Sequence, residues 1–153
     1  MPKLSEPTIA ERLDHWPIAR LASISADGRP HQVPIVFARS RERLWSPVDG
    51  KPKSGRELAR VRNVRERPRV SLLLDEYSAD WTRLWWIAID ADARVLQPEP
   101  ERDAFDAALR ALREKYPQYE SVPLVPEPPT LLEFRPTRIR SWCGVGPAQP
   151  ESP

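Results

Sequence analysis

The 153-residue sequence predicts an α+β domain dominated by an antiparallel β-sheet. Two alternating apolar runs, at about residues 18–25 and 31–38, flank an Asp-Gly turn that supplies the positive φ needed by hairpin turns. Further strand-like runs follow at about 43–48, 69–76, 84–96 and 130–142. Helical periodicity occurs in three places: near the N-terminus, at about 54–65 and at about 101–116.

The helix boundaries are predicted from capping patterns. Thr8 and Glu11 form a capping-box pattern at the start of the first helix, and Ser54 and Glu57 form one at the second. Pro68 ends the second helix, because the residue before a proline avoids helical geometry. The apolar faces are Ile9, Leu13 and Trp16 in the first helix, Leu58, Val61 and Val64 in the second, and Phe105, Ala108, Leu109, Leu112 and Tyr116 in the third.

Three strands are predicted to be irregular, two because they contain a proline and one because it is long. Pro34 cannot donate a ladder hydrogen bond, so its strand is predicted to lie at a sheet edge or to bulge there. The 84–96 run is long for one strand, which predicts a bend or bulge near Asp90–Asp92. The closing strand is predicted to be broken or bulged at Pro136, and the proline-rich 119–130 stretch to be extended over the surface.

Composition is consistent with one domain at 1–143 and a flexible C-terminal tail at 144–153. The net charge of +2 gives no electrostatic reason to expect nucleic acid or membrane binding by the whole molecule. Cys143 is the only cysteine, which excludes an intrachain disulfide. The sequence has no apolar signal core and no run of membrane-spanning length, so we expect a soluble cytoplasmic protein.

The charge is concentrated in residues 51–69, which contain eight Lys or Arg and two Glu, a local balance of +6. On a helical wheel Arg56, Arg60 and Asn63 cluster opposite the apolar face, and Lys51 and Lys53 precede the helix start, where free backbone N–H groups favour anions. Arginine also offers bidentate geometry to phosphates and carboxylates. We interpret the segment as an anion-binding site; a solvated helix face is the structural alternative.

Adjacent tryptophans at 85 and 86 point to opposite sides of their predicted strand. One can belong to the core, and the other is predicted to face a partner subunit or a ring-shaped ligand, because aromatics supply a large flat contact area. Trp45, Trp81 and Trp142 are weaker candidates for that role, and ordinary packing is the alternative for each. We assign Trp86 to the candidate ligand site.

Catalytic side chains are scarce. His15 and His31 are the only histidines and lack a metal-ligand spacing, so no metal site is predicted. Nucleophile-elbow, Walker and dinucleotide-binding glycine motifs do not occur in the sequence. We name no catalytic residue: if the protein is an enzyme, a cofactor supplies the reactivity and the chain supplies binding, orientation and electrostatics.

Three segments, in order, resemble the flavin and deazaflavin split-barrel superfamily, typified by pyridoxamine 5'-phosphate oxidase-like (PPOX-class) proteins. They are Arg20–His31, Lys51–Asn63 and Asp80–Trp86, and the resemblance covers nearly all of residues 8–142. The sequence is most similar to a subgroup of coenzyme F420-dependent enzymes. The resemblance implies an antiparallel split β-barrel of the FMN-binding type with flanking helices, where the strand pattern alone leaves barrel and sandwich open.

The resemblance also implies a homodimer with two cofactor sites at the subunit interface. The cofactor ring would lie against the second and third strands, bordered by the backbone of Pro34, Ile35 and Val36, and its phosphate would lie near the basic segment. The expected cofactor-binding residues are therefore Pro34, Ile35, Val36, Lys51, Lys53, Arg56, Arg60 and Trp86.

Within that set, Arg60 matches a position where relatives place a phosphate-binding Lys or Arg, and Lys53 and Arg56 fit the same role. The connection from Lys51 to Glu57 is longer than in relatives. Pyridoxamine phosphate oxidases proper carry further substrate-binding residues near the C-terminus that this chain lacks, which argues against that specific activity.

The leading hypothesis is a coenzyme F420-dependent oxidoreductase that transfers hydride between reduced deazaflavin and a small organic substrate. F420 carries a phosphate and a tail of carboxylates, and the +6 segment exceeds what one phosphate needs. An FMN-binding oxidoreductase of the pyridoxamine-phosphate-oxidase-like type is one alternative, and a non-catalytic protein that binds flavin, F420 or haem is another. A nucleic-acid partner is not expected, because the basic segment is short and lacks interleaved aromatics.

Overall fold

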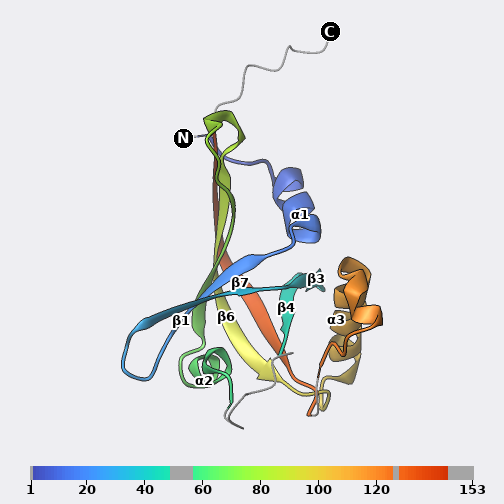
Figure 1. Cartoon of the computed structure of the whole chain (residues 1–153). Coiled ribbons are helices and arrows are strands. Elements are labelled where there is room, and N and C mark those ends of the chain that lie inside the picture. The colour runs from blue at the N-terminus through green and yellow to red at the C-terminus, as the bar shows by residue number, and fades with distance from the viewer. Residues whose placement is uncertain (1, 49–56, 126–127, 145–153) are drawn as a thin grey trace.

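The computed structural model describes residues 2–48, 57–125 and 128–144. These residues form one antiparallel sheet of seven strands with helices packed on it. The spatial order is β2-β1-β5-β6-β7-β4-β3 (Figure 1). The strands are β1 (Ala19–Ile24), β2 (Pro30–Ile35), β3 (Ala38–Ser40), β4 (Arg43–Pro47), β5 (Arg69–Glu76), β6 (Trp85–Leu96) and β7 (Leu131–Cys143). The helices are α1 (Glu6–His15), α2 (Ala59–Glu66) and α3 (Arg102–Lys115), with 3₁₀ turns η1 (Trp81–Arg83) and η2 (Pro117–Glu120).

The two edge strands of this sheet are neighbours in the chain. β2 and β3 stand at opposite ends of the strand order, yet only Val36 and Phe37 separate them in sequence. The sheet therefore curls until its two edges are linked by this short connection, which is the arrangement of a split barrel. The predicted α+β class and split-barrel architecture are confirmed.

Two apolar cores hold the fold together. The inner core lies inside the curled sheet and collects inward-facing residues such as Leu21, Leu72 and Ile87, all fully buried. Helices α1 and α2 add residues to it, Leu13 from α1 and Val61 from α2. The outer core lies between α3 and the outer face of β3, β4 and β7.

The helix starts differ from the capping predictions. α1 begins at Glu6, with Ser5 as its N-cap and the Thr8 backbone N–H donating to Ser5 Oγ at 3.3 Å, so the predicted start at Thr8 is wrong. A proline in the first turn costs nothing there, because its missing N–H would have no helical partner. α2 begins at Ala59 after an extended Leu58 that packs on the inner core, so the predicted Ser54–Glu57 capping box is also wrong; residue 54 itself lies outside the described residues.

The predicted 31–38 strand is two strands. β2 ends at Ile35 and β3 begins at Ala38. Between them, the Phe37 backbone N–H and carbonyl oxygen bond to the Tyr116 hydroxyl and not to a neighbouring strand. The Phe37 N–H donates to that hydroxyl at 3.0 Å, and the Phe37 carbonyl oxygen lies 2.9 Å from it. In the turn between β1 and β2, Gly28 has a φ of +82°, as the Asp-Gly pattern predicted.

The long strand pair β6–β7 contains the predicted irregularity, but in β7. Asp90 pairs with Arg138 and the next residue, Ala91, pairs with Pro136, so Thr137 is the extra residue of a bulge. The bulge predicted at Pro136 is thus confirmed, whereas β6 runs through Asp90–Asp92 without a break. In the 119–130 stretch, η2 takes residues up to 120, and the described remainder has no regular element.

Candidate functional site

The outer face of the sheet is covered at one end and open at the other. α3 covers it over β3, β4 and the start of β7 (Figure 1). There Trp45 and Leu131 of the sheet form one buried cluster with Phe105 and Leu112 of α3. On β1, β5, β6 and the second half of β7 the outward residues stay partly or largely exposed. We call this part the open face; its residues are Arg20, Leu73, Asp75, Trp86, Ala88 and Arg140.

An apolar depression of about 300 Å³ lies on the open face. Its lining residues come from the adjacent strands β5, β6 and β7 and from the residue that follows β5: Leu73, Asp75, Tyr77, Trp86, Ala88 and Arg140. Leu73 is 36% exposed and forms an apolar patch with its neighbours Trp86 and Ala88. An exposed apolar floor of this kind marks a surface for a ligand or a partner.

Two arginines flank the apolar floor. Arg20 donates to Asp75 at 2.7 Å, and Arg140 donates to Asp90 at 3.4 Å. Both guanidinium groups remain about half exposed. Because a guanidinium has five N–H donors, each can engage an anionic ligand group while it keeps its carboxylate partner.

The predicted ring-bordering stretch does not lie wholly on the open face. Pro34 is exposed and shares a cross-sheet row with Arg20 and Leu73, so it faces outward. Ile35 is only 5% exposed and points into the inner core, and Val36 packs beside the outer core after β2 has ended. β2 pairs with β1 alone in the described sheet, which confirms the predicted edge position.

Pro34 and Trp86 lie on the same face but not in contact. Two strands, β1 and β5, stand between β2 and β6. At the usual spacing of strands this is roughly 14 Å along the sheet. One ring system therefore cannot rest on Trp86 and on the β2 backbone of the same subunit.

The basic segment is described only from residue 57 onward; Lys51, Lys53 and Arg56 lie outside the described residues. Arg60 lies half-buried in the first turn of α2. Asn63, which the helical wheel grouped with Arg60, is instead 5% exposed and donates to Ser23 Oγ at 3.0 Å, so that grouping is wrong. A buried amide needs a partner, and the Ser23 hydroxyl of β1 supplies it.

A further bond also tethers the end of α2 to the β1–β2 hairpin. The Arg67 guanidinium, just after α2, donates to the Ala26 carbonyl oxygen at 3.1 Å in the hairpin turn. The helix that carries Arg60 is therefore fixed against the hairpin that carries Pro34.

The tryptophan pair divides as predicted. Trp85 lies in the inner core, 3% exposed, with its ring edge-to-face against Trp16 at 4.6 Å. Trp86 points to the open face, beside its cross-strand neighbour Trp142. Of the weaker candidates, Trp45 is a core residue whose Nε1–H donates to the Ser40 carbonyl oxygen, whereas Trp81 is 78% exposed.

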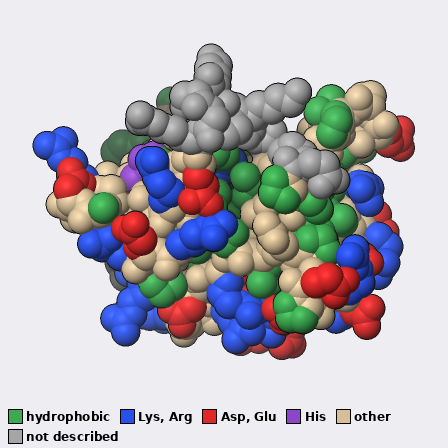
Figure 2. Space-filling model, turned by 90° about the horizontal axis from the view of Figure 1, so that it is seen from below, with side chains coloured by type: hydrophobic (Ala, Val, Ile, Leu, Met, Phe, Trp, Pro, Cys, Tyr) green, Lys and Arg blue, Asp and Glu red, His purple; other side chains and the backbone are tan. Residues whose placement is uncertain are grey.

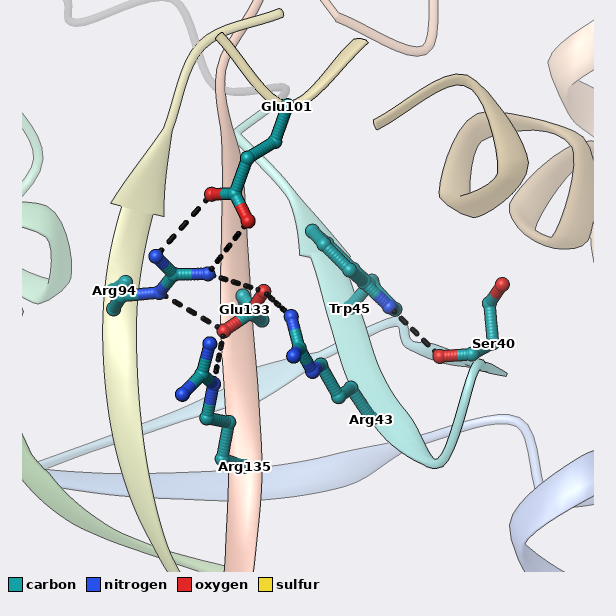
Figure 3. Close-up of polar contacts among 7 residues, drawn as sticks. All are labelled: Ser40, Arg43, Trp45, Arg94, Glu101, Glu133 and Arg135. Carbon is teal, nitrogen blue, oxygen red and sulfur yellow. Dashed lines mark hydrogen bonds and ion pairs between the residues drawn. The ribbon is translucent and has the colours of Figure 1, made fainter. Parts of the chain in front are cut away.

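A buried carboxylate on the covered part of the outer face was not predicted. Glu133 of β7 is fully buried and accepts bonds from Arg43, Arg94 and Arg135, with Glu101 bound to Arg94 on the far side (Figure 3). Burial opposes ionisation of Glu133, but the arginine bonds outweigh it and lower its pKa. A charged residue inside the apolar Leu-Leu-Glu-Phe run of the closing strand was the available signal.

Charges elsewhere are mixed in sign. On the face seen in Figure 2, Lys and Arg side chains of the described residues are interspersed with Asp and Glu. No three His, Cys, Asp or Glu side chains in the described ranges are grouped so that they could bind a metal ion. Within the same ranges, the helices are too short or too polar to cross a membrane.

The sequence profile of the family described as pyridoxamine 5'-phosphate oxidase matches residues 5–143. The chain belongs to this family. No curated protein matches it.

Solved structures share the fold of this family member. A conserved hypothetical protein of Mycobacterium tuberculosis is 23% identical, with a TM-score of 0.71 over 92% of this chain and 85% of that one. A FAD-binding protein of Mesorhizobium loti is 22% identical (TM-score 0.63; 91% and 94% covered). The haem storage protein HutZ of Vibrio cholerae is 17% identical (TM-score 0.59; 94% and 96% covered).

A flavin-binding family implies a flavin-type cofactor, and the open face has suitable chemistry for one. Leu73, Ala88 and Trp86 offer an apolar and aromatic surface to a flat ring. Arg20 and Arg140 place positive charge at its margins. The residues present therefore fit the group.

Proposed function

We propose that this member of the pyridoxamine 5'-phosphate oxidase family is a coenzyme F420-dependent oxidoreductase, which transfers hydride between reduced deazaflavin and a small organic substrate. The observation that carries the proposal is the +6 charge balance of residues 51–69, in a segment whose helix is tethered to the β1–β2 hairpin through Asn63 and Arg67. FMN carries one phosphate, whereas F420 adds several carboxylates that so many cations can neutralise.

Each part of the chain has a role in this proposal. Lys51, Lys53, Arg56 and Arg60 hold the phosphate and the anionic tail. The backbone from Pro34 to Val36 borders the ring, and Trp86 contacts the ring bound at the other subunit's β2. The cofactor supplies the hydride chemistry; the chain binds and orients it and keeps its charged end neutralised.

The separation of Pro34 from Trp86 supports a homodimer. Because the two lie three strand spacings apart within one subunit, a ring bordered by β2 would reach Trp86 of the partner subunit instead. Burial of Leu73 and the rest of the apolar floor in such an interface removes exposed apolar surface from water. We infer two equivalent sites, each completed by both subunits.

A flavin-dependent oxidoreductase is the second candidate, favoured by the likeness to the FAD-binding protein of Mesorhizobium loti. A non-catalytic haem binder is a third, favoured by the likeness to HutZ. The absorption spectrum of the purified protein separates the three, because bound flavin, deazaflavin and haem absorb at different wavelengths. A Soret band would reject both oxidoreductase proposals.

Charge reversal in the basic segment tests the proposal. Loss of one charge-assisted contact costs about 1.5–3 kcal/mol, which is about tenfold to a hundredfold in affinity. Arg60→Glu and Lys53→Glu should each weaken F420 affinity by more than this, because charge reversal adds repulsion. Arg113→Glu is the matched control, because Arg113 is an exposed arginine in the last turn of α3. If all three variants bind F420 as tightly as the parent, the segment does not bind the cofactor and is a solvated helix face.

A further inference from the structure

A second pocket shares no residue with the open face. It encloses about 480 Å³ between the end of α1, strand β3 and the last turns of α3. Two small residues, Ala38 and Ala111, leave room for it, and polar side chains form the rest of the wall: Asp14, His15, Arg39, Glu114 and Lys115.

Lys115 is the buried amine of this pocket. Its Nζ donates to the Leu13 carbonyl oxygen at 3.2 Å and lies 3.6 Å from the centroid of the Phe37 ring. These contacts hold the amine in one place, against the connection between β2 and β3. The stem of the side chain is covered, while the amine still borders the pocket.

The pocket gives this amine little charge compensation. Asp14, the acid on α1, is already paired with Arg39 of β3 through two bonds of 2.8 and 2.7 Å. The other titratable groups around the amine are His15 of α1, Glu114 of α3 and Tyr116 just after α3. The Tyr116 hydroxyl is bonded to the Phe37 backbone. No carboxylate in the described ranges forms an ion pair with Nζ. Burial therefore lowers the pKa of Lys115 to about 8, with the nearby Asp14 charge opposing the shift.

We propose that Lys115 is a covalent binding site for small aldehydes, at which its amine, held in the pocket between α1, β3 and α3, forms an imine. The nitrogen lone pair attacks the carbonyl carbon and forms the C–N bond, and a proton moves from nitrogen to the carbonyl oxygen. The C–O bond then breaks, the hydroxyl leaves as water with the second proton of the nitrogen, and the C=N bond forms, so no oxidant or reductant is consumed. Desolvated lysines are the amines that carry out this chemistry in proteins.

The proportion of uncharged amine gives the expected selectivity. At pH 7 an amine with a pKa of about 8 is roughly 10% uncharged, against roughly 0.03% for an ordinary lysine. The lower basicity offsets part of this difference, because a weaker base is a weaker nucleophile. We expect Lys115 to react at least tenfold faster than Lys3, an exposed lysine outside the pocket.

The test uses the full chain, benzaldehyde as the probe, and borohydride to reduce the imine to a stable amine. The chain has four lysines, so peptide mapping by mass spectrometry assigns every labelled position and separates Lys3 from the N-terminal amine. We expect the early label on Lys115, with a rate that rises to a plateau above about pH 8. Equal rates at Lys115 and Lys3, or a rate at Lys115 that still rises above pH 10, would overturn the proposal.

Ala111→Leu tests whether the pocket itself is the route. The added side chain fills space beside the amine but leaves Lys115 in place, so labelling of Lys115 should slow at least fivefold while labelling of Lys3 is unchanged. A thermal melt of the variant verifies that it is folded. Unchanged labelling of Lys115 in the folded variant would show that the aldehyde does not enter this pocket and would refute the assignment.

Discussion

The buried carboxylate of Glu133 makes the sharpest stability prediction. Four N–H groups converge on its two oxygens: Arg94 Nε and Arg135 Nε at 3.0 Å on Oε1, and Arg43 Nη1 and Arg94 Nη2 at 2.8 Å on Oε2 (Figure 3). Glu133→Gln replaces one oxygen with an NH₂ group. Whichever way the amide turns, two of the four donors then face a donor instead of an acceptor.

Each hydrogen bond to a charged group contributes about 1.5–3 kcal/mol, and breaking a buried ion pair costs about 3–5 kcal/mol. The arginines are 31–48% exposed and can recruit water, so we take the lower end, about 3 kcal/mol. For a chain of this size that lowers the melting temperature by about 6–12 °C. Asp90→Asn is the matched control, because it breaks an exposed pair with Arg140 and should cost about 1 kcal/mol or less.

The dependence on pH follows from the lowered pKa of Glu133. A carboxyl whose pKa is lower in the folded protein stabilises fully above its ordinary pKa of 4.5, and the contribution is lost as the pH falls through the folded value. Urea unfolding at pH 7 should therefore separate Glu133→Gln from the parent by about 3 kcal/mol, and the difference should narrow below about pH 4.5. A difference under 1 kcal/mol at pH 7, or one that does not change with acid, would refute the reasoning.

Other predictions concern the β2–β3 connection and the subunit interface. Tyr116→Phe removes the hydroxyl that bonds the Phe37 backbone and should cost about 1–3 kcal/mol in urea unfolding. Burial raises the pKa of Tyr116 to about 12, so its contribution is complete below about pH 10 and is lost as the pH rises toward 12; a loss already present at pH 8 would contradict this. Sedimentation equilibrium should show a homodimer that buries about 2,000 Å² or more, and a monomer at micromolar concentration would count decisively against it. Trp86→Arg should dissociate that dimer, whereas Trp81→Arg, at an exposed position in η1 that does not line the depression, should not.

The sheet was predictable because its signals are local and repeated. Alternation located β5, β6 and β7 to within one or two residues at each end, and the Asp-Gly turn located the first hairpin. The second hairpin was missed because its turn places Arg41 and Glu42 at positive φ, where glycine or asparagine is the usual signal. Neither residue is a glycine or an asparagine, so this turn has no local signal in the sequence.

The site was less predictable for the same reason. The opposite orientations of Trp85 and Trp86 follow from strand geometry alone, and they were predicted correctly. The burial of Asn63 depends on Ser23, which is 40 residues away, and the burial of Glu133 depends on Arg43, which is 90 residues away. A helical wheel or an alternation pattern contains no information on such partners.

The central claim is that the basic segment selects a cofactor with several negative charges. Paired titrations of the purified protein with F420 and with FMN, each repeated across a salt series, test it most directly. F420 should bind more tightly at low ionic strength and should lose affinity more steeply as salt is added, because more charge pairs are screened. Tight FMN binding with little or no F420 binding at any salt concentration would contradict the claim and favour a flavin-dependent oxidoreductase.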